Sequence, residues 1–133
     1  MGYIRHHAIV VTGTDYIPMA GNPQGITPAQ AKAVEIFGAR NVSALLKSVM
    51  NGYHSFFVQP DGSKEGWADS DTGDRLRDEF VAWLDVQRYT DGSGPLDWVE
   101  VQYGDDELVT AVCRDSDALP RSKEAQRRKE QVV

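Results

Sequence analysis

Residues 42–59 read Val-Ser-Ala-Leu-Leu-Lys-Ser-Val-Met-Asn-Gly-Tyr-His-Ser-Phe-Phe-Val-Gln. Two runs with strand-like composition, 42–50 and 53–59, stand on either side of the pair Asn51-Gly52. Asn-Gly is the strongest short signal for a β-hairpin, because both residues tolerate the positive φ angles of a two-residue turn. The segment therefore predicts a hairpin near the middle of the chain.

A helix is predicted on the N-terminal side of this hairpin. Thr27 can cap the helix, Pro28 suits its first position, and Gln30 completes a capping box with the threonine. Gly38 is expected to end the helix, because glycine readily adopts the left-handed conformation that follows a last turn.

A second helix is predicted after the hairpin. Ser70 or Asp71 can cap it, and the acidic residues of its first turns suit the positive end of the helix dipole. Apolar residues then recur at helical spacing until the pattern fades near Arg88. These apolar residues are Leu76, Phe80, Trp83 and Leu84.

Further strands are predicted beyond the two helices. Residues 4–12 include the β-branched run 9–12, and a loop rich in proline and glycine, 14–26, leads from them to the first helix. After the second helix, residues 96–103 alternate between apolar and polar side chains, and 108–113 return as a last strand.

The predicted order is strand, helix, strand, strand, helix, strand, strand. Its first six elements match a ferredoxin-like split β-α-β arrangement, with two helices on one face of the sheet and an extra C-terminal hairpin strand. In this interpretation the first and third strands are parallel neighbours. We expect one α+β domain over residues 1–114, followed by a charged, disordered tail over 115–133.

Charge is distributed unevenly along the 133 residues, whose formal net charge is −6. Residues 1–120 contain 9 Lys and Arg against 18 Asp and Glu, whereas residues 121–133 contain 5 against 2. An acidic body disfavours direct binding of nucleic acid, because phosphate contacts need cations. The apolar run 8–11 is too short to span a membrane, and the single cysteine fits a reducing compartment, so we expect a cytoplasmic protein.

Three histidines are weak candidates for a metal site. His6 and His7 open the first predicted strand, and His54 opens the third. If these strands are parallel neighbours, their starts lie together, and His54 approaches whichever of the first pair shares its face. A metal or phosphate site, or a His-dependent enzyme, is one interpretation. Half-exposed histidines at strand ends are the simpler one, because no third metal ligand is evident.

Motifs typical of enzymes are absent from the sequence. It contains no dinucleotide-binding fingerprint, no phosphate-binding loop and no serine nucleophile elbow. Cys113 is most simply a buried structural cysteine, because nothing nearby in the sequence would lower the pKa of its thiol. We therefore expect neither catalysis nor a cofactor.

Aromatic and polar side chains are concentrated in residues 53–67. Because helices cover one face of the predicted sheet, the other face is expected to carry aromatics such as Tyr53 or Phe56, plus Trp98. A second subunit or a planar ligand would cover them; the alternative is that the extra hairpin or the long loop folds over this face. Aromatic rings stack on bases, and a lysine or arginine can hold phosphate. The candidate ligand-binding residues are Tyr53, His54, Phe56, Lys64, Trp67 and Trp98.

In two stretches, Asn51–Trp67 and Leu96–Glu107, the sequence resembles small, uncharacterised, bacteriophage-encoded proteins. Those proteins are compact and acidic and lack enzyme motifs. The resemblance implies an accessory role, such as counter-defence or modulation of a host protein, and it identifies no residue as functional.

The leading hypothesis is a non-enzymatic homo-oligomer that sequesters a small anionic, nucleotide-like ligand. The alternative is an acidic inhibitor or adaptor that binds a host protein through a dense acidic surface, with association that weakens in salt.

Overall fold

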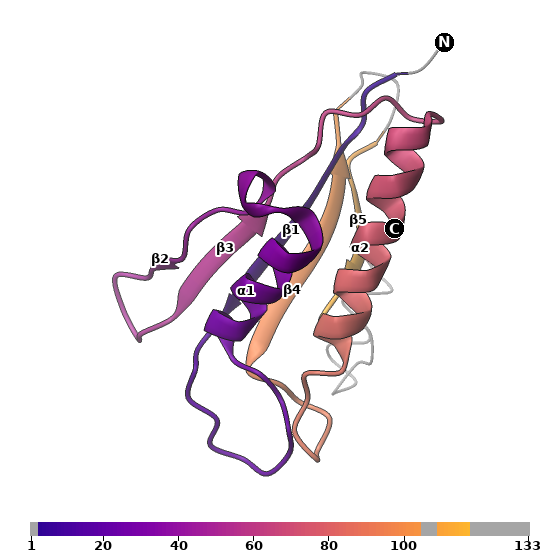
Figure 1. Cartoon of the computed structure of the whole chain (residues 1–133). Helices are drawn as coiled ribbons and strands as arrows, with labels where there is room; N and C mark the ends of the chain where they lie inside the picture. The colour runs from indigo at the N-terminus through magenta and orange to yellow at the C-terminus, as the bar shows by residue number, and fades with distance from the viewer. Residues whose placement is uncertain (1–2, 105–108, 118–133) are drawn as a thin grey trace.

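The computed structural model describes residues 3–104 and 109–117, which form a five-stranded antiparallel sheet with two helices against one face (Figure 1). The strand order is β2-β3-β1-β4-β5. This α+β arrangement is compatible with the predicted split β-α-β layout. In chain order the elements are β1 (His6–Gly13), α1 (Ile26–Phe37), the 3-10 turn η1 (Ala39–Asn41), β2 (Leu46–Lys47), β3 (His54–Val58), α2 (Ala68–Asp85), β4 (Leu96–Tyr103) and β5 (Ala111–Asp115).

The first and third strands are antiparallel, so the prediction that they are parallel is wrong. Ile9 lies opposite Val58, and Gly13 lies opposite His54. The α1 crossover makes β1 and β2 run in the same direction, and β3, which lies between them, must then run opposite to both. As a result His54 lies at the far end of β1 from His6 and His7.

The predicted hairpin turn is confirmed. Asn51 and Gly52 have φ angles of 68° and 69°. The strand before the turn, β2, contains only two residues and is much shorter than expected. Upstream of it the ladder is interrupted at Ser43, whose hydroxyl accepts a hydrogen bond from the backbone N–H of Phe57 at 2.9 Å. A side chain that bonds to backbone in this way competes with regular strand pairing.

The first helix is capped from the preceding loop and not by Thr27. Asp15 accepts two hydrogen bonds from that threonine, one from the backbone N–H at 2.9 Å and one from the hydroxyl at 2.6 Å. Gly25 occupies the N-cap position. A Cβ atom at Gly25 would lie 2.5 Å from a carboxylate oxygen of Asp15, so the close approach requires glycine.

The second helix also begins earlier than predicted, with Trp67 at the N-cap. Ser70 is buried in its first turn, and its hydroxyl donates a hydrogen bond to Glu65 at 3.3 Å. The sheet, in turn, continues past the predicted domain boundary at residue 114. The backbone N–H of Ser116 donates to the carbonyl of Trp98 at 3.0 Å, whereas residues 118–133 of the predicted tail lie outside the described residues.

The hydrophobic core lies between the helices and the sheet and is centred on Phe80, which is fully buried. Its ring makes an edge contact with Phe37 and a stacked contact with Trp83, with centroid distances of 5.7 and 6.3 Å. Phe56 and Trp98 are 2% and 6% exposed and belong to this core. The prediction that these two aromatics lie on the open face is therefore wrong.

We expect Asp15→Ala to lower the free energy of unfolding by about 1 kcal/mol at neutral pH, because it removes the cap of α1. The hydrogen bonds from Thr27, foremost that of its hydroxyl, hold the pKa of Asp15 below its ordinary value. Because the pKa of Asp15 is lower in the folded chain than in the unfolded chain, its ionised form stabilises the fold at pH values above the unfolded pKa. This contribution is lost as the pH falls through the folded pKa. Urea unfolding should therefore show the difference at neutral pH and a smaller difference below about pH 4.

The matched control is Asp15→Asn, which retains one oxygen acceptor and should lose less stability than the alanine variant. Equal stability of the wild type and Asp15→Ala at neutral pH would contradict the capping role.

Candidate functional site

The predicted histidine cluster does not form. His6 lies opposite Tyr103, with its ring centroid 5.3 Å from that of the tyrosine. His7 points to the helix side, where its Nε2 lies 2.6 Å from a carboxylate oxygen of Glu65. His54 is at the other end of β1, as its pairing shows. Within residues 3–104 and 109–117, no group of three or more His, Cys, Asp or Glu side chains is arranged to hold a metal ion.

The six predicted ligand-binding residues lie in three separate places. Phe56 and Trp98 are in the core. The ammonium group of Lys64 lies 5.3 Å from the ring centroid of the exposed Trp67, near the start of the sheet. Tyr53 and His54 are at the opposite end, about 30 Å away along β1 at the rise of an extended chain. These residues do not surround one cavity.

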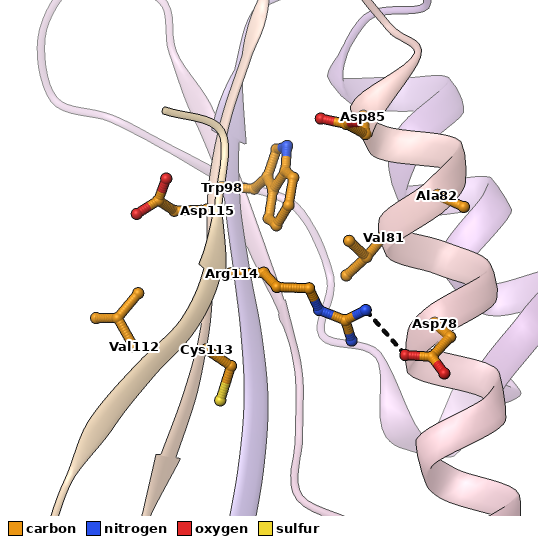
Figure 2. Close-up of a pocket in the computed structure, with 9 residues that line it drawn as sticks. All are labelled: Asp78, Val81, Ala82, Asp85, Trp98, Val112, Cys113, Arg114 and Asp115. Atoms are coloured by element: carbon orange, nitrogen blue, oxygen red, sulfur yellow. Dashed lines mark hydrogen bonds and ion pairs between the residues drawn. The ribbon is translucent and has the colours of Figure 1, made fainter. Parts of the chain in front are cut away.

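A groove between α2 and the edge of the sheet has better geometry for binding (Figure 2). Its cavity volume is about 420 Å³. Trp98 and Val81 face each other across its apolar part, and Ala82 extends that part along the helix. Asp78 and Asp85 line the helix side, seven residues apart and therefore on the same side of α2.

A polar cavity of about 440 Å³ continues the groove toward the start of α2. The two cavities share Asp78, Cys113 and Arg114. We call the combined feature the α2–β5 groove. Its polar half is also lined by His7, Asp74, Arg77, Glu100 and Gln102.

Arg114 joins the walls of the groove. Its Nε and Nη2 donate to the two carboxylate oxygens of Glu100 at 2.6 and 2.9 Å, and its Nη1 donates to Asp78 at 2.8 Å (Figure 2). A shift of register between Glu100 and Val101 places Arg114 directly opposite Glu100. The hydrogen bonds with Glu100 are the main cause that raises the pKa of Arg114, which therefore stays charged.

Arg77 is a second guanidinium group in this network and is buried, whereas Arg114 is half-buried. Arg77 lies 2.5 Å from Asp74, 3.9 Å from Asp61 and 4.0 Å from Glu100. Both arginines are thus engaged by carboxylates. An anionic ligand would have to displace these carboxylates to reach either guanidinium group.

The balance of charge in the α2–β5 groove is negative. Four carboxylates on the helix side of the sheet line it, and they outnumber the two arginines. An anion is therefore disfavoured and a cationic group is favoured. The four are Asp74, Asp78, Asp85 and Glu100; Asp115 also borders the cavity, but its side chain points away from α2 (Figure 2).

The sequence contained one signal of this site. Trp98, Glu100 and Gln102 share one face of β4 by alternation, and an acidic residue beside a tryptophan on an inward face needs a cationic partner. Arg114 could not be identified as that partner, because a register shift is not visible in the sequence.

Comparison of the chain with protein-family models, curated proteins and solved structures finds no match. Among the residues that the structure describes, no helix has the length and apolar character needed to cross a membrane.

Cys113 is exposed, so the prediction of a buried structural cysteine is wrong. Partial desolvation in the groove, followed by the charge of Glu100, raises the pKa of the thiol. Since the thiolate is the nucleophile, we expect iodoacetamide to alkylate the folded chain more slowly than the urea-unfolded chain at neutral pH. Mass spectrometry over a pH series would measure both rates, and equal rates would contradict the raised pKa.

We expect Arg114→Ala to lower the free energy of unfolding by about 2 kcal/mol, because it leaves the carboxylate of Glu100 buried with only the more distant Arg77. The value is below that for a fully buried pair, since water reaches part of Arg114. Urea unfolding would measure the loss.

Adding Glu100→Gln to Arg114→Ala should recover part of the lost stability, because no buried charge is then left without its partner. Arg75→Ala is the matched control. Arg75 is an exposed arginine of α2 whose guanidinium group donates to Thr72, and its loss should change stability by less than about 0.5 kcal/mol. Similar losses for Arg75→Ala and Arg114→Ala would contradict the role of the buried pair.

Proposed function

We propose that this chain is a non-enzymatic binding protein whose α2–β5 groove receives a basic, partly apolar segment of another protein. The observation that supports this most is an apolar surface between Trp98 and Val81 beside a lining in which carboxylates outnumber arginines. An apolar anchor gains free energy by leaving water, and flanking cations gain by meeting the carboxylates.

The dimensions of the groove suit a short peptide segment. From Asp74 to Asp85 the helix rises about 16 Å. This length matches about five residues of an extended chain or three turns of a helix. Asp78 and Asp85 are exposed along this length. Each makes one ion pair, Asp78 with Arg114 and Asp85 with Arg88, and the exposed part of each carboxylate can still meet a cationic partner.

Sequestration of a small anion, such as a nucleotide, has less support from this geometry. The arginines of the groove are paired with carboxylates, and Lys64 lies far from Tyr53 and His54. Modulation of a host protein is also one of the roles implied by the resemblance to bacteriophage accessory proteins. The scaffold that we infer for it is ferredoxin-like, with β5 added at the sheet edge.

Selection from a display library of random short peptides tests the proposal. We expect the selected peptides to be enriched in lysine and arginine around one or two large apolar residues. Fluorescence anisotropy with a selected peptide should show binding that weakens as salt is added. Binding should also protect Cys113 from iodoacetamide, since this residue lines the groove.

The double variant Asp78→Asn and Asp85→Asn should weaken peptide binding about tenfold, because it removes two favourable charges of the lining. The matched control is Asp69→Asn with Glu79→Gln, which changes the net charge equally on the same helix but outside the groove lining. Selection of acidic or purely apolar peptides would contradict the proposal, as would equal binding by the two double variants.

A further inference from the structure

The face of the sheet opposite the helices carries a second surface, which we call the open sheet face. It is defined by Val10, Phe57, Val99, Val101, Tyr103 and Val112, which alternate away from the helices. Val10 is on the central strand and is still 39% exposed, and Phe57 beside it is 42% exposed. Figure 2 shows the side chain of Val112 pointing away from α2. A contiguous apolar patch on a sheet face is typical of an interface.

We propose that a second copy of this chain covers the open sheet face, giving a homodimer with the helices of both copies on the outside. This inference goes beyond the proposed function, because it uses the opposite face of the sheet and none of the peptide-binding residues of α2.

Charge identifies the second copy as the occupant. Each chain carries a formal net charge of −6, so two copies repel each other unless their contact surface carries few charges. Among the described strand residues that point to the open sheet face, Asp97 and Asp115 are the only carboxylates, and none is lysine or arginine. Asp117, just after β5, borders the same end of the face. A basic partner would find more carboxylates in the α2–β5 groove, and an anion would find no lysine or arginine on these strands.

The position of the two carboxylates also selects the orientation of the copies. Asp115 lies opposite Val99, which lies opposite Val10, so Asp115 is level with Val10 along the strands, whereas Asp97 lies opposite Thr12. A two-fold axis that lies in the contact plane and runs along β1 brings Val10 of one copy near Val10 of the other. This axis places the Asp115 side chains of the two copies toward opposite edges of the contact. An axis across the strands through Val10 would bring the two Asp115 side chains face to face.

The area of the face suits a weak dimer. β1 and β4 have eight residues each and β3 and β5 five each, which at about 3.3 Å rise and about 4.8 Å strand spacing gives a sheet of about 400 Å² per copy. A pair of copies then buries about 800 Å², which is the size of a weak, transient interface. The apolar contact should therefore support dimerisation in the high micromolar range and not a permanent assembly.

Sedimentation velocity of the full chain at high micromolar concentration tests the proposal. We expect a species of twice the 14.7 kDa chain mass. Val10→Asp puts a charge at the centre of the contact in both copies, and we expect it to raise the dimer dissociation constant by about 100-fold or more. Phe57→Lys, beside Val10 on the same face, should also weaken the dimer.

The matched control is Val86→Asp, which makes the same change at an exposed valine just after α2, on the other side of the sheet. This variant should remain dimeric, and circular dichroism would verify that all variants are folded. A wild-type chain that stays monomeric, as it would if residues 118–133 covered the face, overturns the proposal. A dimer that persists in both Val10→Asp and Phe57→Lys also overturns it. The groove variant Asp78→Asn with Asp85→Asn should still dimerise, so the two proposals fail independently.

Discussion

The carboxylate of Glu100 imposes the main constraint on this structure, because it is charged and only 3% exposed. Removing such a group from water costs several kcal/mol unless hydrogen bonds and opposite charges replace the lost solvent. Arg114 supplies a bidentate pair, and Arg77 supplies a second positive charge at 4.0 Å. The pair with Arg114 requires the register shift in β5, and the contact with Arg77 requires α2 to lie over β4. The last strand and the second helix thus both supply a partner to one buried group.

Two surfaces remain incomplete once this network is formed, and they differ in chemistry. Five strands are more than two helices can cover, so a groove remains between α2 and β5, and the far face of the sheet has no cover among the described residues. The groove is lined by the carboxylates that hold Arg77 and Arg114, together with others on the same side of the helix. The open sheet face is largely apolar because β1 and β4 place valines on it. The acidic chain therefore presents one surface suited to a cationic segment and one suited to a second copy of the chain.

Local signals in the sequence predicted much of the fold. The turn at Asn51-Gly52 follows from the φ preferences of two adjacent residues, and the end of α1 follows from one glycine, Gly38. Alternation also showed correctly which residues of a strand share a face. It could not show which face the helices cover, and for this reason Phe56 and Trp98 were expected on the wrong side. The Asp15 cap and the pairing of Arg114 with Glu100 join distant residues, and local spacing contains no information about such pairs.

The carboxylates are concentrated in the α2–β5 groove and the apolar residues on the open sheet face, which explains how both surfaces can bind at the same time. In the proposed dimer the helices of both copies face outward, so each α2–β5 groove stays open to solvent. Two grooves in one particle can bind two segments of one partner, and the second contact then benefits from a high effective concentration. The same negative charge that draws a cationic segment into the groove keeps the helix sides of two copies apart. Association of the chain with itself is thereby directed to the open sheet face.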